Sequence, residues 1–311
     1  MTTRVETGEV DGFATVTLRN AAVSVTVVPA LGARLISLRA VPGAREWLWR
    51  PDDGRGLFAC AAGTAFEDGP LAGSDECVPS VAPCVVEGQA IPDHGEVWNR
   101  EWIFDPTERD AITTRIELQT RPLDFGRRIS LAGNELRLDY TLTNRSAQPA
   151  GYLWALHPLF TLEEGDAVEL HGEAEVVVQG TQESALAGGE RGPWPTLQGQ
   201  GRLDHAETAS ISAPGKPNSY LKAFLSTAQA PAITLIDRRR GERLTLKVAP
   251  HEIGAWGYWL SRGGWFGHTH IALEATNGAA DGLDELTPGN PAHTLAPHEV
   301  RTWTVRIVLA T

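Results

Sequence analysis

Alternation of apolar and polar residues is the sequence feature that most constrains how this chain folds. In several segments apolar side chains recur at every second position, which is the spacing of a strand with one buried face. Clear examples are residues 23–27, 136–142, 244–248 and 303–309. Turn-forming residues separate these segments, and no long window shows the i, i+3, i+4 spacing of an amphipathic helix. The pattern therefore predicts an all-β fold.

The number of predicted strands indicates the architecture. More than a dozen alternating segments are too many for one small barrel, and antiparallel sheets with one apolar face bury it by packing on a second sheet. A length of 311 residues is compatible with a single large all-β domain. We therefore expect one domain over residues 1–311, built as a large antiparallel β-sandwich.

Charge and cysteine content exclude several classes of protein. The formal net charge of -12 is spread along the chain, and its one sizeable basic run, Arg238 to Arg240, stands in a predicted turn. Nucleic acid is therefore not an expected partner. Three cysteines without a Cys-x-x-Cys pair indicate neither a disulfide framework nor a zinc ribbon.

The apolar segments are also too short for a membrane protein. No segment approaches the ~20 consecutive apolar residues that span a bilayer, and the chain does not open on an apolar signal segment. We expect a cytoplasmic protein without a membrane partner, present as a monomer or a homodimer.

Two stretches in the first third of the chain gather polar groups suited to a small polar ligand. Asp75 and Glu76 stand side by side between a Gly and a Pro. Residues 92–98 contain His94 and end at Trp98. Carboxylates, imidazoles and indoles are side chains that can hold such a ligand by hydrogen bonds and by packing.

Two later stretches place single polar groups in apolar surroundings. His157 follows an apolar run that begins at Tyr152, and Glu274 follows an apolar strand downstream of Trp256. A histidine in such a place is often only a satisfied core residue, and a buried carboxylate is costly unless it is paired or hydrogen-bonded. The residues alone leave both a structural and a functional reading open.

In this order and at these distances, the stretches resemble segments of the aldose 1-epimerase family. Residues 25–38 resemble the opening strands of that family, and residues 94–102 its first-histidine segment. Residues 157–160 resemble its His-Pro-Tyr-Phe segment, residues 273–274 its catalytic glutamate segment, and residues 295–303 the approach to its final strand.

The resemblance implies a galactose mutarotase-like supersandwich and an isomerase that interconverts the α and β anomers of a hexose or related sugar. Glu274 would be the general base at the anomeric hydroxyl, and His157 the general acid at the ring oxygen, where an unperturbed imidazole titrates near ~6.5. No cofactor and no metal is required. The expected sugar-binding residues are His94, Glu76, Trp98 and Trp256. We expect His94, His157 and Glu274 to line one concave face, with Trp98 or Trp256 as a wall.

Two departures from the family limit what the resemblance implies about the sugar. Many relatives have Arg where this chain has Trp98, so phosphate recognition is not supported. Galactose-specific relatives have an Asn-Arg pair where this chain has Asp75 and Glu76, so galactose specificity is not supported either. The sequence leaves the identity of the sugar open.

Two rival functions remain open at this stage. His268, His270 and Glu274 fall on one face of a predicted strand and resemble the first metal motif of the cupins, which would suit iron or manganese. The second cupin segment is poorly matched by residues 288–293. A noncatalytic carbohydrate-binding protein is the other rival, and it would not need His157 opposite Glu274.

Overall fold

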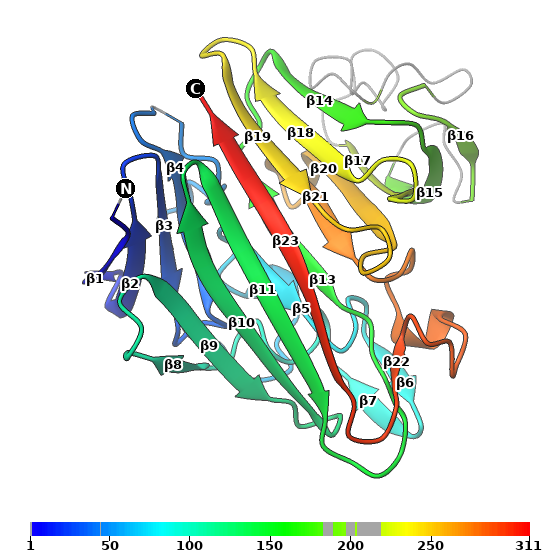
Figure 1. The fold of residues 1–311 in the computed structure, drawn as a ribbon. Helices are drawn as coiled ribbons and strands as arrows, with labels where there is room; N and C mark the ends of the chain where they lie inside the picture. The colour runs from blue at the N-terminus through cyan, green and yellow to red at the C-terminus, as the bar shows by residue number, and fades with distance from the viewer. Residues whose placement is uncertain (1, 44, 183–188, 197–202, 204–218) are drawn as a thin grey trace.

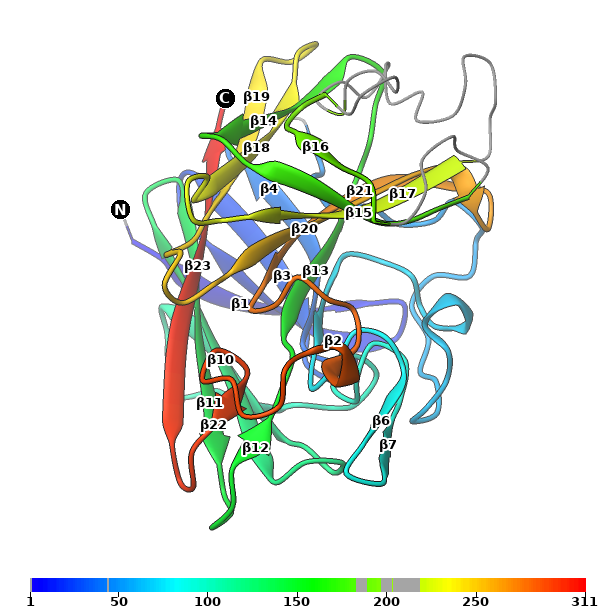
Figure 2. The ribbon, with the colours of Figure 1, turned by 90° about the vertical axis from the view of Figure 1, so that its right-hand side faces the viewer.

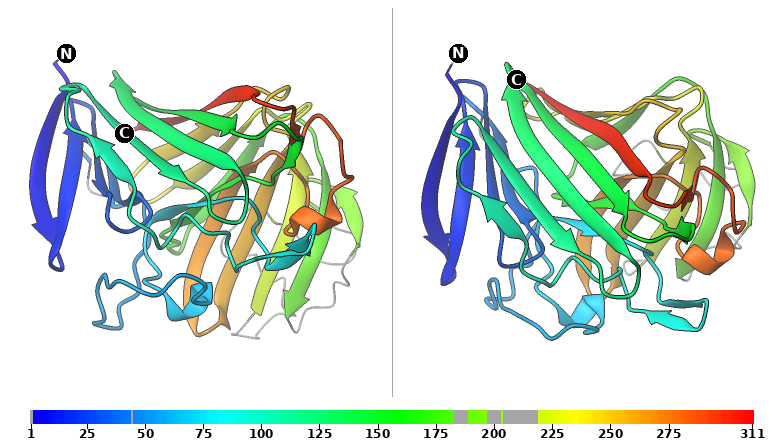
Figure 3. Two further views of the ribbon diagram at one scale, coloured as in Figure 1. Left: turned by 90° about the horizontal axis from the view of Figure 1, so that it is seen from below. Right: turned by 60° about the horizontal axis from the view of Figure 1, so that its bottom comes forward.

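The computed structural model describes residues 2–43, 45–182, 189–196, 203 and 219–311. Within these residues nearly all regular structure is antiparallel β-strand, which confirms the predicted all-β class. Two large sheets pack face to face as the layers of a sandwich (Figures 1 and 3). None of the described helical segments has the length and apolar character needed to cross a membrane.

The larger sheet has eleven strands and carries the central part of the fold. Its strands, in spatial order, are β1 (Arg4–Val10), β2 (Phe13–Arg19), β3 (Val23–Val28), β4 (Arg34–Ala40), β5 (Ser74–Cys77), β13 (Ala155–Phe160), β21 (His268–Thr276), β20 (Ala255–Trp265), β17 (Ser219–Ser226), β15 (Glu175–Gln182) and β16 (Arg191–Pro193).

The smaller sheet has eight strands, with the C-terminal strand β23 near its middle (Figure 1). Its strands are β14 (Asp166–His171), β18 (Ala232–Asp237), β19 (Glu242–Lys247), β23 (Val300–Ala310), β11 (Glu135–Asn144), β10 (Leu123–Ala132), β9 (Ala111–Glu117) and β8 (Ile103–Asp105). The remaining elements are the pairs β6 (Cys84–Val86) with β7 (Gln89–Ile91) and β12 (Ala150–Gly151) with β22 (Thr294–Leu295), and the 3-10 turns η1 (Phe66–Asp68) and η2 (Leu283–Glu285).

Strand β11 shows how the alternating sequence builds the interface between the sheets. Leu136, Leu138, Tyr140 and Leu142 are at most 1% exposed, whereas the alternate residues Arg137, Asp139 and Thr141 are partly or fully exposed. Burying one such side chain is worth about 1.5–3 kcal/mol relative to leaving it in water. The same periodicity in the other strands gives one buried apolar cluster that extends along the chain from Val16 to Leu309.

A polar network crosses this apolar interior and connects the two sheets. Glu76 on β5 accepts hydrogen bonds from Arg127 on β10 (2.7 Å), from the Tyr140 hydroxyl on β11 (2.9 Å) and from the Trp154 indole (2.8 Å). Glu76 and Arg127 are at most 1% exposed. Glu76 therefore faces the smaller sheet, and its predicted role as a sugar-binding residue is corrected to a contact between the sheets.

Alternation along β5 also decides which side chains face away from the smaller sheet. Because Glu76 points inward, its neighbours Asp75 and Cys77 point to the outer face of the larger sheet. Figure 2 shows the loop that carries η1 and the β6–β7 hairpin on this same side of the molecule. The outer face of the larger sheet is where the candidate site lies.

Candidate active site

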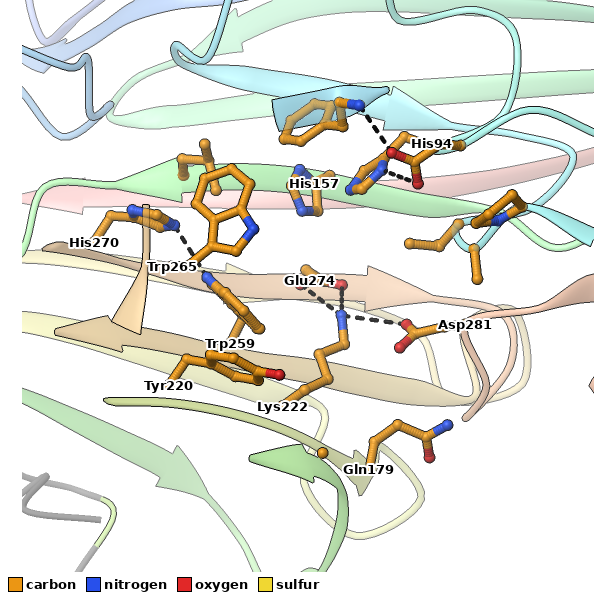
Figure 4. A pocket seen from close by; sticks show the side chains of 17 residues that line it. His94, His157, Gln179, Tyr220, Lys222, Trp259, Trp265, His270, Glu274 and Asp281 are labelled. Atoms are coloured by element: carbon orange, nitrogen blue, oxygen red, sulfur yellow. Dashed lines mark hydrogen bonds and ion pairs between the residues drawn. The ribbon is translucent and has the colours of Figure 1, made fainter. Parts of the chain in front are cut away.

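A pocket of about 330 Å³ lies on the outer face of the larger sheet (Figure 4). Its size is near the lower end of the range for small-ligand sites. Strands β13, β21, β20, β17 and β15 supply one side, and the loops around η1 and β7 supply the other. The polar side chains that line it include His94, His157, Lys222, His270, Glu274 and Asp281.

His157 and Glu274 stand opposite each other on neighbouring strands. Leu159 on β13 pairs with Ala272 on β21, so two positions further along these antiparallel strands His157 faces Glu274. Residues opposite each other in an antiparallel pair have Cβ atoms about 4.5–5.5 Å apart and project from the same face. Both side chains line the pocket, and both are nearly buried, at 6% and 1% exposed.

Lys222 from β17 holds the carboxylate of Glu274. Its Nζ donates to Oε1 and Oε2 of Glu274 at 2.9 and 2.7 Å and lies 3.4 Å from Oδ1 of Asp281 (Figure 4). Burial disfavours the ammonium, but Asp281 and Glu274 outweigh that penalty and raise the pKa of Lys222. Glu274 therefore faces the pocket as an ion-paired group on the surface of the sheet, not beneath it.

A glycine on the intervening strand makes room for this ion pair. Gly257 on β20 pairs with Glu274 on one side and with Phe224 on the other. A Cβ atom at position 257 would lie 2.7 Å from Oε2 of Glu274, closer than Cβ atoms normally approach. The missing side chain leaves the space in which the carboxylate and Lys222 meet.

The imidazole of His157 lies among aromatic rings at the inner end of the pocket. Its ring centre is 5.0 Å from that of His94 and 5.2 Å from that of Phe66, both close to perpendicular. Burial, and then the positive charges of neighbours led by His94 and Lys222, lower the pKa of His157 well below 6.5. The expectation of an imidazole that titrates near its ordinary value is therefore corrected, because this ring is desolvated.

His94 reaches the pocket from a loop with unusual backbone geometry. Its φ is 57° and that of Gly95 is 70°, both in the left-handed region. A Cβ at position 95 would overlap the backbone of Val78, so glycine is required where the loop packs on the end of β5. The His94 ring stacks on Phe66 at 3.9 Å, and its Nδ1 lies 2.9 Å from Oδ1 of Asp93.

The aromatic walls differ from those predicted. Trp259 and Trp265 line the pocket, whereas Trp256 is 0% exposed in the core and donates to the carbonyl of Ala230 (2.8 Å). Side chains alternate along β20, so Gly257 and Trp259 face the pocket while Trp256 faces the smaller sheet. The predicted wall role of Trp256 is corrected for this reason.

Trp98 is also placed behind the pocket lining. It is 1% exposed, contacts Phe66 and donates from its indole nitrogen to the carbonyl of Asp93 (3.1 Å). This hydrogen bond supports the loop that carries His94. The predicted contact of Trp98 with sugar is therefore corrected to a supporting role.

The rival metal triad on β21 is not assembled. His270 Nε2 accepts the Trp259 N–H (3.0 Å), burial lowers the pKa of His270 to about 3, and Glu274 is bound by Lys222. His268, His270 and Glu274 are not a set of donors that lie within 4.8 Å of one another in the described part of the chain. The arrangement does not favour the iron or manganese alternative.

Sequence reasoning missed several lining residues. Lys222 could have been recognised from the sequence. A lysine between Leu221 and Ala223 interrupts an apolar strand and is costly to bury without a partner. Asp281 and Trp265 could not have been recognised in this way, since they stand in loop-like surroundings among many similar residues.

The chain matches one family in sequence. The sequence model of the aldose 1-epimerase family matches residues 14–307. No curated protein matches the chain.

Solved structures share the fold over nearly the whole chain. A protein from Synechocystis sp. PCC 6803 is 15% identical with a TM-score of 0.68, and the alignment covers 96% of each chain. A galactose mutarotase-like protein from Clostridium acetobutylicum is 12% identical with a TM-score of 0.69, over 99% of this chain and 98% of that one. A galactose mutarotase-like protein from Lactobacillus casei ATCC 334 is 16% identical with a TM-score of 0.59, over 95% of this chain and 100% of that one. At these identities the likeness shows the fold, as predicted.

Proposed function

Since the chain belongs to the aldose 1-epimerase family, we propose that it interconverts the α and β anomers of a free, neutral aldose such as a hexose. The observation that carries this proposal is the opposition of His157 and Glu274 on neighbouring strands, at the surface of one pocket. General acid–base chemistry needs two such groups on either side of the reacting centre.

The proposed reaction opens and recloses the sugar ring. Glu274 takes the proton of the anomeric hydroxyl, and the imidazolium of His157 gives a proton to the ring oxygen as the C1–O5 bond breaks. Rotation about the C1–C2 bond turns the aldehyde, and the two groups exchange roles when the ring closes from the other face. The two groups start as carboxylate and imidazolium and end as neutral acid and imidazole, so charge is neutralised between them.

The remaining lining favours an uncharged sugar. Trp259, Trp265 and Phe66 offer aromatic surface against which the C–H face of a pyranose can pack, and His94 is placed to hydrogen-bond a hydroxyl. Among the described lining residues Lys222 is the one Lys or Arg, and two carboxylates already bind it. A sugar phosphate would find no unpaired cation among these groups.

Anomer exchange measured by NMR saturation transfer tests the proposal directly. A panel of free aldoses, with and without phosphate, should include at least one neutral sugar whose exchange is faster than its uncatalysed rate. Sugar binding without any acceleration of exchange across the panel would support a noncatalytic binding protein instead. The cytoplasmic location and the monomeric or homodimeric state stay predictions from the sequence.

Extensive chelation should not lower this activity. Glu274 and His157 supply both proton transfers in the scheme, and neither step requires a metal. The measurement is the exchange rate before and after dialysis against a strong chelator. A loss that iron or manganese restores would return the His268, His270 and Glu274 alternative to consideration.

The pH dependence of kcat/KM should show that only a small fraction of His157 is protonated at neutral pH. Burial keeps the pKa of His157 well below 6.5, so the imidazole is neutral at pH 7 and the protonated form grows as pH falls. We expect kcat/KM to rise as pH falls from ~8 to ~6.5, by roughly tenfold per unit, since this window lies above the pKa of His157. A flat profile, after subtraction of the uncatalysed rate, would contradict imidazolium as the acid.

One neighbouring group titrates in the same window and needs a control. Burial raises the pKa of Asp75 to about 7, and Asp75 pairs with His157 across strands β5 and β13. The Asp75→Asn variant should keep the slope of the profile if His157 sets it.

Replacing Gly257 by Ala should lower the exchange rate by roughly tenfold to a hundredfold, because misplacement of a catalytic group by about 1 Å has effects of this size. The new Cβ would displace the carboxylate of Glu274. The matched control is Gly126→Ala on β10, where the nearest atom would be at 3.6 Å, an ordinary contact. Equal rates in the two variants would show that the position of this carboxylate does not matter.

A further inference from the structure

A second set of donor side chains adjoins the proposed acid. One ligand atom from each of Cys77, His94 and His157 lies within 4.8 Å of the other two. Among the described residues this is the one group of three His, Cys, Asp or Glu side chains that meets this distance. Cys77 pairs with Ala155, two positions before His157 on β13, so both side chains project from the outer face of the sheet. The set therefore comes from two adjacent strands and one loop.

The loop that carries His94 is fixed to the end of β5, beside Cys77. The amide of Glu96 donates to the carbonyl of Val78 (3.1 Å), and the amide of His94 donates to the carbonyl of Val81 (2.7 Å). These bonds hold the His94 backbone in its left-handed conformation. The third donor is thus held by backbone contacts in addition to its ring stacking.

The nitrogen atoms in this set are available as ligands. Nδ1 of His157 is buried and has no hydrogen-bond partner in the described structure. Asp93 can only accept with its carboxylate, so Nδ1 of His94 donates to it and Nε2 is the ring atom that remains for a ligand. A carboxylate that orients a histidine in this way is a common feature of metal sites.

The charged groups around the set are largely paired with one another. The carboxylates of Glu274 and Asp75 are paired with Lys222 (2.7 Å) and with the buried Arg34 (2.8 Å), and the carboxylate of Asp93 contacts the His94 ring. Burial, and then the charges of Asp75, Glu274 and Glu76, raise the pKa of the Cys77 thiol well above its ordinary value, so a metal has to displace the thiol proton on binding.

We propose that Cys77, His94 and His157 bind one Zn²⁺, with the fourth coordination position open to the pocket. One thiolate and two imidazoles suit zinc, whose bonds of about 2.3 Å to sulfur and about 2.0–2.1 Å to nitrogen place tetrahedral donors roughly 3.3–3.6 Å apart. The donors therefore need to move together by about 1 Å or slightly more. Side-chain rotation of His94, which is partly exposed, can supply much of this movement.

Zinc at this place inhibits anomer exchange, an inference that rests on the proposed function. A metal that uses the lone pairs of His157 and His94 removes the proposed acid and a sugar-binding group in one step. The site is therefore an inhibitory one, and zinc and sugar compete for the same pocket.

Direct binding measurements test the metal site without reference to activity. Zinc affinity is measured by competition with a chromogenic chelator, and Co²⁺ serves as the spectroscopic probe. We expect one Zn²⁺ per chain and a thiolate-to-cobalt charge-transfer band. The Cys77→Ser variant should lose the band and bind zinc at least tenfold more weakly, and Asp93→Asn should weaken binding by roughly ten- to a hundredfold.

Two matched controls use the other cysteines of the chain. Cys60 and Cys84 are free and partly exposed, and their Ser variants should keep the cobalt band and the zinc affinity. Thermal shift confirms folding of every variant, and His94→Ala, a change in a loop, replaces Cys77→Ser if the latter does not fold. Zinc binding that is absent, or that is unchanged in both Cys77→Ser and His94→Ala, overturns the site.

The activity arm separates this inference from the proposed function. In the wild-type chain zinc should slow anomer exchange and a chelator should restore it, whereas Cys77→Ser should resist zinc. Zinc binding without inhibition of anomer exchange overturns the inhibitory role of zinc and the role of His157 as the acid, but not the metal site itself. Absence of binding together with rapid exchange overturns the metal site and leaves the proposed function intact.

Discussion

Replacing Glu274 by Gln should lower catalysed anomer exchange by on the order of 10²–10⁴, while affinity for the sugar changes by less than about tenfold, roughly 1.4 kcal/mol. Gln keeps the size and hydrogen-bonding capacity of the side chain but cannot accept the anomeric proton. His157→Asn should behave similarly, because it removes the group that gives a proton to the ring oxygen.

This expectation is checked by saturation-transfer NMR for the rate and by calorimetry for the affinity. Loss of the ion pair with Lys222 could also affect the fold, so thermal shift accompanies each variant. Glu175→Gln on β15 is the matched control, since Glu175 is exposed in the same sheet. Near wild-type exchange in both Glu274→Gln and His157→Asn would leave carbohydrate binding without catalysis as the better account.

Replacing Arg127 by Met should reduce the free energy of unfolding by about 3–5 kcal/mol, the range found when one partner of a buried ion pair is removed. Glu76 would keep its hydrogen bonds from Tyr140 and Trp154 but would be left as a buried charge without a countercharge. The double variant Arg127→Met, Glu76→Gln should recover part of this loss.

Urea denaturation measures this change, and the neighbouring residue on β10 provides the control. Arg128 forms a partly exposed ion pair with Glu108, so Arg128→Met should cost no more than about 1 kcal/mol. If Arg127→Met lowers the free energy of unfolding as little as Arg128→Met does, Glu76 is either un-ionised or hydrated in the folded chain. That result would contradict a buried ion pair between Glu76 and Arg127.

The sequence allowed the strands to be predicted because alternation is a property of each strand on its own. Leu136, Leu138 and Leu142 show this plainly, since a single buried face makes the period of two visible. That His157 and Glu274 face each other could be predicted only from the resemblance to the aldose 1-epimerase family. Pairing between strands far apart in the sequence leaves no pattern in either strand.

The errors at the site come from strands that are buried on both faces. All four residues of β5 are buried, so the sequence does not show that Asp75 faces outward and Glu76 inward. On β20 the same ambiguity led to Trp256, although Trp259 faces the pocket. A shift of one residue exchanges the two faces of a strand, and alternation cannot decide between them without a polar side.

The place of β21 in the larger sheet has a consequence for how the protein is made on the ribosome. This strand lies between β13 and β20, although β13 is synthesised more than a hundred residues earlier. Until β21 emerges, the edge of β13 that will receive it has unpaired amide and carbonyl groups. The nascent chain therefore carries an open strand edge and a pocket without Glu274 while more than a hundred residues are added, and this is the stage at which aggregation or chaperone binding is most expected.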